Sequence, residues 1–415
     1  MIPPLLRERP FRRFWAGQTV SLVGDQISLF AVPITAVLVL RANATQMGLL
    51  TAAGLLPSLL FSLAAGSVID RRGHRRRTML AADLGRALLM ATVPLSYALG
   101  RLGLSQLYAV TFAVGVLDVL FFVAYNGLFV SVVSPDRYVE GQSLLNGSRA
   151  MSSVLGQSGA GLLIAAITAP GAILVDAASF LLSAFALMRI HPAEPPTEPA
   201  THGHLIAGIR FIRDSRIVRA ALGATATVNF FTLAFNAIVI LYATRELHIR
   251  PAVLGLVLGA GAIGGLLGSL VTGRITRLIG VGPAFVVGCV LFPAPLLLVP
   301  LASGPRIVVL ACLFAAEFLA GAGVMLLDIS IGAIFAAAIP DRLRSRVSGA
   351  YRTVNYGIRP LGALTGGLLG SAIGLRPTLL LASLGGVTCV LWLMRTPVPR
   401  LHGLAAARES ATVEP

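Results

Sequence analysis

Long apolar stretches, separated by short polar segments, run through the whole sequence. Each stretch can cross a bilayer, because a helix needs about 20 apolar residues to span the hydrocarbon core. A helix also satisfies its own backbone hydrogen bonds, as any segment embedded in lipid must. The pattern therefore predicts an all-α integral membrane protein with twelve transmembrane helices. The predicted spans are residues 15–40, 46–69, 78–100, 104–133, 143–167, 169–188, 220–243, 252–273, 282–303, 307–337, 353–373 and 377–394.

The composition agrees with a membrane protein and disfavours three other classes. Hydrophobic residues make up 56% of the chain and charged residues 12%, and the mean hydropathy is +0.84. Soluble domains carry about 25% charged residues. Cys289, Cys312 and Cys389 lie inside apolar stretches, without the spacing of a metal site or a disulfide framework. A soluble enzyme, a nucleic-acid-binding protein and a secreted disulfide scaffold are therefore disfavoured.

All 33 basic residues are arginine, and their positions predict the orientation of the chain. With a cytoplasmic N-terminus, 24 arginines fall on the cytoplasmic side, six in outer loops and three within spans. Positive residues gather on the cytoplasmic side of membrane proteins. We therefore expect a multi-pass protein of the cytoplasmic (inner) membrane with both termini inside. The first apolar stretch is too long for a cleaved signal peptide and is expected to remain as the first helix.

A hydrophilic segment at residues 189–219 separates the spans into two sets of six. Its first part is rich in proline and predicts an extended linker. Its second part interleaves apolar residues with arginine and predicts a basic amphipathic helix on the inner leaflet. We predict an N-terminal six-helix bundle at 1–188, this cytoplasmic linker at 189–219, a C-terminal six-helix bundle at 220–394 and a cytoplasmic tail at 395–415.

Two short patterns recur about half a chain apart. Gly66 and Gly73 have the spacing of Gly273 and Gly280, which lie 207 residues later. The tripeptide Pro-Asp-Arg at 135–137 recurs at 340–342. This recurrence predicts a duplicated six-helix unit, an architecture found in secondary transporters.

The loop after the second span resembles motif A of the major facilitator superfamily. The shared frame is a glycine, three residues, Asp-Arg, one residue, a second glycine and a basic run. It is carried here by Gly66, Asp70, Arg71, Gly73 and Arg75. The resemblance implies the major facilitator fold and a cytoplasmic latch at these residues that holds the outward-open state. The alternative is that the arginines only set the topology.

A narrower resemblance is to the macrolide-efflux and siderophore-exporter branch of the drug:proton antiporters, also called transmembrane secretion effectors. It is carried by the first helix around Gly17, Gln18 and Asp25, by Asp176, and by the Pro-Asp-Arg at 340–342. It covers nearly the whole chain. In the fifth span, Gln157 replaces the proline of the antiporter motif, and the fourth span lacks an arginine that many of these antiporters have. The resemblance therefore specifies the fold more strongly than the direction of transport.

Nine ionisable residues lie within the predicted spans. A charge in the bilayer is costly and is usually kept for a transport pathway or an ion pair. The nine are Asp25, Asp83, Arg86, Asp118, Arg149, Asp176, Glu317, Asp328 and Arg359.

The superfamily resemblance implies that spans 1, 4, 7 and 10 line a central cavity. The acids on these spans are therefore the candidates for proton coupling, and the nearest arginines are their expected counter-charges. The acids are Asp25, Asp118, Glu317 and Asp328, and the counter-charges are Arg149 and Arg359.

The individual roles of these residues stay open at this point. Asp25 is the first proton-coupling candidate because it lies near the bilayer midplane. The alternative is a fixed ion pair with Arg149 or Arg359. Asp83 and Arg86, three residues apart, predict a local structural pair, and Asp176 is interpreted as structural.

Polar residues of the seventh span are candidates for substrate contact. Asn229 and Asn236 are seven residues apart and share a helix face, so they contact either the substrate or a neighbouring helix. The glycine-rich stretch at 259–265 lies inside a span with no strand before it, and therefore predicts helix packing rather than a dinucleotide site.

These observations favour a secondary active exporter that exchanges protons for an amphipathic drug, secondary metabolite or siderophore. No ATP-binding motif is present, so the expected energy source is the proton gradient, with no cofactor and no metal. The expected partners are a small-molecule substrate, protons and the lipid bilayer, with no nucleic acid, and a monomer is expected. The alternative within transport is an importer or facilitator of a polar metabolite. Outside transport, a membrane-embedded enzyme or a non-transporting sensor would also be compatible with the fold.

Overall fold

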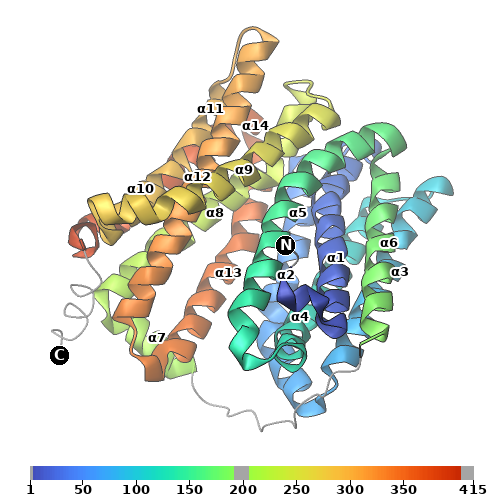
Figure 1. The fold of residues 1–415 in the computed structure, drawn as a ribbon. Helices are drawn as coiled ribbons and strands as arrows, with labels where there is room; N and C mark the ends of the chain where they lie inside the picture. Colours follow the sequence, from blue (N-terminus) through green and yellow to red (C-terminus); the bar gives the residue numbers. More distant parts are fainter. Residues whose placement is uncertain (1–2, 191–204, 403–415) are drawn as a thin grey trace. The chain divides into compact units, whose positions relative to one another are not determined.

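The computed structural model describes residues 3–190 and 205–402, with side chains for all of these except 63–64, 66–72, 205–208, 341–342 and 345. The described chain is helical apart from short connections (Figure 1). The helices of the first half are α1 (Arg9–Ile34), α2 (Ala44–Arg72), α3 (Arg75–Ala98), α4 (Leu104–Val132), α5 (Tyr138–Ile167) and α6 (Ala169–Met188). Those of the second half are α7 (Leu205–Asp214), α8 (Arg216–Arg245), α9 (Pro251–Ile279), α10 (Val281–Leu291), α11 (Leu298–Leu301), α12 (Arg306–Ala338), α13 (Asp341–Ala372), α14 (Leu375–Val387) and α15 (Leu391–Met394).

Within the described residues, eleven helical segments are long and apolar enough to cross a membrane. They match all the predicted spans except 353–373, which lies in α13. That helix is long enough, but Asn355, Arg359 and several glycines lower its hydropathy. The segment Val281–Leu301 is interrupted between α10 and α11, where Pro293 and Pro295 have no backbone N–H to donate.

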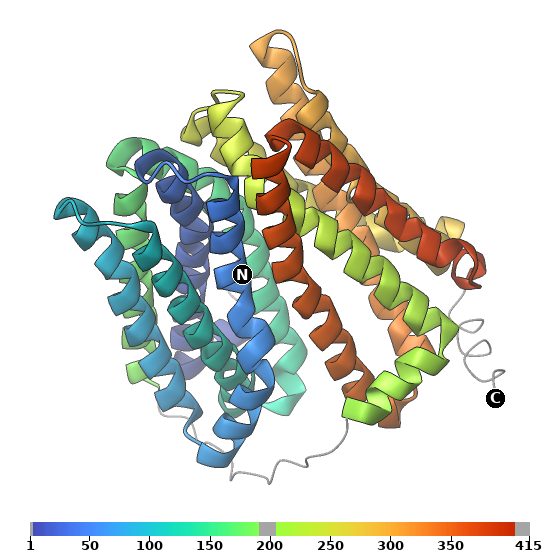
Figure 2. The ribbon, with the colours of Figure 1, turned by 180° about the vertical axis from the view of Figure 1, so that it is seen from behind.

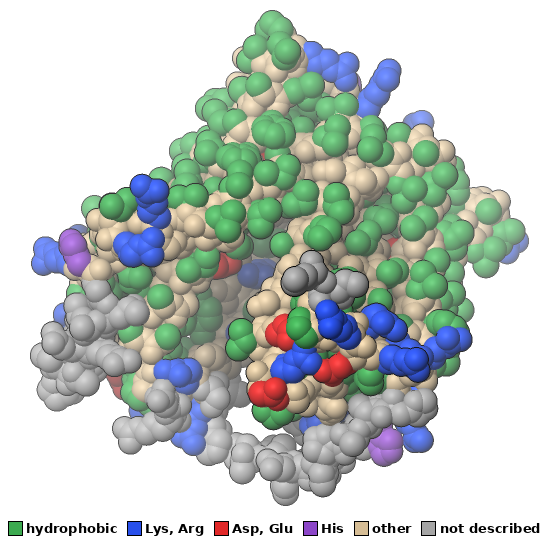
Figure 3. All heavy atoms as spheres, viewed as in Figure 1, with side chains coloured by type: hydrophobic (Ala, Val, Ile, Leu, Met, Phe, Trp, Pro, Cys, Tyr) green, Lys and Arg blue, Asp and Glu red, His purple; other side chains and the backbone are tan. Residues whose placement is uncertain are grey.

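Apolar side chains cover much of the helical surface visible in Figure 3. Leu88, Leu270 and Ile307 are 71%, 72% and 77% exposed. Apolar surface on this scale suits contact with acyl chains rather than with water. The surface therefore agrees with the predicted membrane protein.

The helices group into two compact units. The first contains α1, most of α2, α3 to α6 and the first residues of α9, and the second contains the start of α2, α7, α8 and the remaining helices. In the first unit, α1 packs against α5 and α6, and α3 packs against α4 and α6. In the second unit, α8 packs against α13 and α14, and α10 packs against α12 (Figure 2). The domain boundaries at residues 188, 219 and 394 remain a prediction.

The internal repeat has a counterpart in the backbone. Gly73 begins the connection from α2 to α3 and has φ +66°, and Gly280 separates α9 from α10 and has φ +92°. Residues with a Cβ atom rarely adopt positive φ, so both positions favour glycine. The two glycines that recur in the sequence thus make the same type of break between consecutive helices.

The amphipathic helix predicted in the linker is α7. Its Ile212 is buried in an apolar cluster with Val218, Ile339 and Val347, whereas Ile209 is 54% exposed. The apolar face of α7 therefore packs partly against protein, on α8 and α13. The proline-rich part of the linker at 191–204 and residues 403–415 of the predicted tail lie outside the described residues.

The orientation is tested by a cysteine placed in the linker. Thr197→Cys should react with a membrane-impermeant maleimide only in everted vesicles, because the arginine distribution places the linker in the cytoplasm. Arg101→Cys, in a predicted outer loop, is the matched control and should react in intact cells. Labelling of the linker cysteine from outside would reverse the assigned topology.

Candidate functional site

Two helices of the first unit present a stripe of side chains to the same cavity. On each helix the four residues follow the spacing i, i+3, i+4 and i+7, which places them on one helix face. On α1 they are Gln18, Ser21, Leu22 and Asp25, and on α4 they are Asp118, Phe121, Phe122 and Tyr125. The cavity has a volume of about 250 Å³, and Arg86 of α3 and Arg149 of α5 complete its lining.

Arg86 is the centre of the charged groups in this unit. Its Nη1 donates to Asp118 Oδ1 at 2.6 Å, and its Nη2 donates to Asp83 Oδ1. The rings of Phe121 and Phe180 lie 4.2 and 4.3 Å from the guanidinium carbon. Arg86 is 3% exposed and the Asp83 side chain 0%, so this charge pair is buried and held in a fixed geometry.

The ion pair predicted between Asp83 and Arg86 is present, but it is part of a larger arrangement. Arg86 also binds Asp118, one of the proton-coupling candidates, whose side chain is half-exposed. The sequence analysis did not connect these residues, because they lie on different helices. Arg86 therefore provides the counter-charge of Asp118, a role for which the sequence analysis had proposed Arg149 and Arg359.

Asp176 of α6 is buried against α1. It accepts a hydrogen bond from Ser179 Oγ at 3.1 Å, and a Cβ atom on Gly24 would collide with its Oδ1. Gly24 thus lets α6 bring Asp176 next to the segment of α1 that carries Asp25.

Asp83 and Asp118 therefore share the buried guanidinium of Arg86, and Asp25 lines the same cavity as Asp118. Carboxyl groups at such a cavity are suited to bind and release protons. No group of three or more metal-ligating side chains occurs among the described residues.

Arg149 approaches the cavity from α5. Its Nη1 lies 3.4 Å from Asn146 Oδ1, and its guanidinium carbon lies 5.6 Å from the Tyr125 ring centroid. Across residues 3–190 and 205–402, no carboxylate forms an ion pair with it. The alternative role of Asp25, a fixed ion pair with Arg149, is thus not seen among the described side chains.

The acid candidates of the second unit are less enclosed by charge. Glu317 is partly buried and its Oε2 lies near Gly261, where a Cβ atom would be 3.4 Å away. Asp328 is exposed. The guanidinium carbon of Arg359 lies 4.5 Å from the centroid of the Tyr356 ring. In the described part of this unit, neither acid forms an ion pair.

The asparagines of α8 have different surroundings. Asn229 Nδ2 donates to Asn355 Oδ1 at 3.0 Å and to Thr225 O at 2.8 Å, and Tyr351 Oη donates to Thr225 Oγ1 at 2.7 Å. Asn229 therefore joins α8 to α13, whereas Asn236 is exposed. Asn355 and Tyr351 were missed by the sequence analysis, although both are polar residues on an apolar helix.

The motif A residues are only partly described. The side chains of Asp70 and Arg71 lie outside the described set, so the latch role of motif A remains a prediction. Arg75 lies across Gly127 of α4, where a Cβ atom would come within 2.9 Å of its guanidinium carbon.

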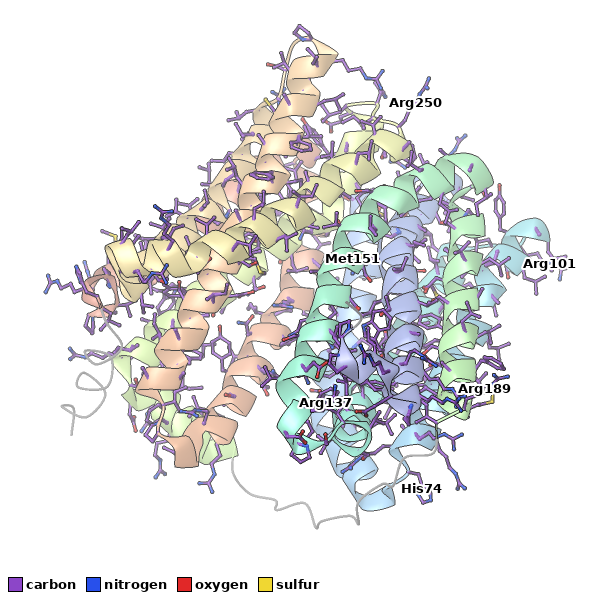
Figure 4. The ribbon with its side chains drawn as sticks, in the orientation of Figure 1. His74, Arg101, Arg137, Met151, Arg189 and Arg250 are labelled. Carbon is purple, nitrogen blue, oxygen red and sulfur yellow. The ribbon has the colours of Figure 1, made fainter. Side chains whose placement is uncertain are left out.

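Neighbouring arginines bind the end of α6. Arg76 donates from Nε to Leu187 O at 2.8 Å and from Nη2 to Met188 O at 2.7 Å. Arg13 Nη1 donates to Arg189 O at 2.6 Å. Cations stabilise the last carbonyls of a helix. These two arginines thus have a structural role at the end of the unit where Figure 4 places His74, Arg137 and Arg189.

Comparison with known proteins decides the family. The profile of the transmembrane secretion effector family, a branch of the major facilitator superfamily (MFS), matches residues 2–415. The chain belongs to this family. Its membership excludes the enzymatic alternative, because these proteins are transporters.

Relatives of this MFS transporter extend over nearly the whole chain. It is 27% identical over 388 residues to the MFS-type transporter YfiS of Bacillus subtilis, covering 90% of each chain. It is 27% identical to the multidrug efflux pump Tap of Mycolicibacterium fortuitum, covering 92% of this chain and 94% of that protein. A bacterial homologue of the iron transporter ferroportin, in an inward-facing state, shares the fold with a TM-score of 0.73 at 18% identity, covering 93% of this chain and 99% of that chain.

The latch prediction is tested by Asp70→Asn. We expect this variant to insert and fold normally but to transport several-fold more slowly, because motif A would lose the negative charge that is expected to face a helix N-terminus. Asp214→Asn, which removes an exposed acid at the end of α7, is the control and should transport normally. Wild-type transport by Asp70→Asn at equal expression would contradict the predicted latch role of motif A.

Proposed function

We propose that this protein is a secondary active exporter that exchanges protons for an amphipathic organic compound, such as a drug, a secondary metabolite or a siderophore. Its family supports transport, and its similarity to Tap proteins, which are named multidrug efflux pumps, supports export. The observation that carries proton coupling is that Asp25 and Asp118 line one cavity of the first unit and that Asp118 shares Arg86 with the buried Asp83.

Asp25 and Asp118 are the proposed proton-coupling residues of this cavity. Asp118 is half-exposed and shares Arg86 with Asp83. When Asp118 takes up a proton, Arg86 keeps its partner Asp83, so the buried cation is never left unpaired. Asp25, on α1, lines the same cavity and forms no ion pair among the described residues. Glu317 and Asp328 remain secondary candidates in the second unit.

The arrangement also supports competition between protons and a substrate cation. A carboxylate at the cavity can bind either a proton or a cationic group, and each lowers its affinity for the other. Binding of one therefore favours release of the other, which is the requirement for exchange across a membrane.

Proton exchange is tested in everted vesicles from cells that express the protein. Candidate substrates come first from a growth-inhibition screen of an expressing and a deleted strain. An exporter of this kind should release protons from energised everted vesicles when such a substrate is added. Uptake of substrate without proton release would instead favour the facilitator alternative.

A further inference from the structure

The charges of the cavity in the first unit are separated along its two lining helices. On α1, Gln18 lies seven residues before Asp25, which is about 10 Å along a helix axis. On α4, Tyr125 lies seven residues after Asp118. Phe14 of α1 stacks on Tyr125 at 5.4 Å, so this part of α4 lies level with the start of the α1 stripe. The acids therefore mark one end of the cavity, and Gln18 and Tyr125 mark the other.

Arg149 belongs to the end that carries Gln18. Thr19 Oγ1 donates to Ser148 Oγ at 3.0 Å, which fixes the neighbours of Gln18 and Arg149 against each other. The Arg149 guanidinium also lies over the ring of Tyr125. Its charge is not neutralised by an ion pair with any acid that the structure describes.

Gln18 indicates independently that this end of the cavity accepts a ligand group. Its side chain is 5% exposed and lines the cavity, yet its Nε2 has no hydrogen-bond partner. A buried donor without an acceptor destabilises the fold. An amide N–H₂ and a guanidinium at the same end of a cavity both donate, so the group that satisfies them is an acceptor, most strongly an anionic oxygen.

We propose that this cavity binds an amphipathic zwitterion. Its anionic oxygen group lies at Arg149 and Gln18, its apolar part lies against Phe121, Phe122 and Leu22, and its cationic group lies at Asp25 and Asp118. This assignment rests on the proposed function and specifies its substrate class. The cationic group competes with protons for the acids, and the anionic group anchors the substrate through Arg149, which takes no part in that competition.

A ligand series with one skeleton tests the assignment by equilibrium binding to the purified protein. The probes are 4-(aminomethyl)benzoate, which carries both charges, 4-methylbenzylamine, which carries only the cation, and 4-methylbenzoate, which carries only the anion. Phenylglycine, an isomer of the first probe with both charged groups on one carbon atom, controls for their separation. The wild type should bind 4-(aminomethyl)benzoate at least about tenfold more tightly than the other three, as expected for hydrogen bonds to charged groups.

Arg149→Gln isolates the anionic end. It should weaken binding of 4-(aminomethyl)benzoate to the level of 4-methylbenzylamine and leave 4-methylbenzylamine binding unchanged. Arg149→Lys should retain part of the preference, because it keeps the charge but not the planar geometry. Arg101→Gln, in the connection between α3 and α4, is the control and should behave as wild type. Melting temperatures of all variants exclude misfolding.

Three results would overturn the proposal. They are equal binding of 4-methylbenzylamine and 4-(aminomethyl)benzoate by the wild type, an equal loss of both in Arg149→Gln, and no binding of any probe. These measurements need no gradient, so they are independent of the exchange mechanism. If 4-(aminomethyl)benzoate binds as expected but moves no protons in vesicles, the proposed function fails and the substrate assignment stands.

Discussion

Arg86→Gln should be the most damaging single change in the first unit. The substitution leaves Asp83 buried without its cation, and breaking a buried pair in this way costs about 3–5 kcal/mol. The side chains of Arg86 and Asp83 are 3% and 0% exposed, so solvent screens the loss very little. We expect low yield and a strongly lowered melting temperature in detergent, and transport lost in any protein that folds.

Two companion variants separate charge from geometry. Arg86→Lys keeps the charge but cannot bridge Asp83 and Asp118 with a planar fork, so it should recover part of the stability and less of the transport. The double variant Arg86→Gln with Asp83→Asn removes the uncompensated acid and should melt higher than Arg86→Gln alone. A wild-type melting temperature for Arg86→Gln would show that the contacts of Arg86 with Asp118 of α4 and Phe180 of α6 do not hold these helices to α3.

Asp25→Asn should abolish the dependence of export on the pH gradient while leaving the fold intact. Asn keeps the size and hydrogen bonding of the side chain but cannot titrate. Arg86 retains Asp83 and Asp118 as partners, so the loss of Asp25 leaves no buried cation unpaired. Export driven by an imposed pH gradient should fall to background, measured against Asp214→Asn as a folded control with an exposed acid removed.

The outcome for Asp25→Asn distinguishes three roles. Good expression with lost gradient dependence supports a proton carrier. Poor expression would indicate a structural ion pair. Good expression with unchanged export would exclude both roles, and Asp118 would become the leading candidate.

Hydrophobic patterning was enough to predict the helices, and the motif A resemblance implied the family-level fold. Stretches of about 20 apolar residues have few folded alternatives in a bilayer. The predicted span 353–373 is helical too, although Asn355 and Arg359 reduce the hydropathy of α13, which packs against α8. Polar residues that bind a neighbouring helix look the same in a sequence as residues that interrupt a span.

The candidate site was predictable only in part. Asp25 and Asp118 were chosen by their helices, and both line the cavity. Their stripes could have been read from the i, i+3, i+4, i+7 spacing of polar and aromatic residues. The ion pair of Arg86 with Asp118 could not have been predicted in this way, because it depends on the register between α3 and α4. Asp176 was interpreted as a structural residue, yet packing at Gly24 brings it next to the segment of α1 that carries Asp25.

The central claim, proton exchange through the acids of the first unit, is tested most directly in proteoliposomes that hold the purified protein and a pH-sensitive dye. With a substrate from the growth screen, the wild type should move protons and substrate in opposite directions, and substrate added without a gradient should generate one. Asp25→Asn liposomes should show no substrate-dependent proton movement. Substrate transport by the wild type with no accompanying proton flux, or equal proton flux in Asp25→Asn, would contradict the account.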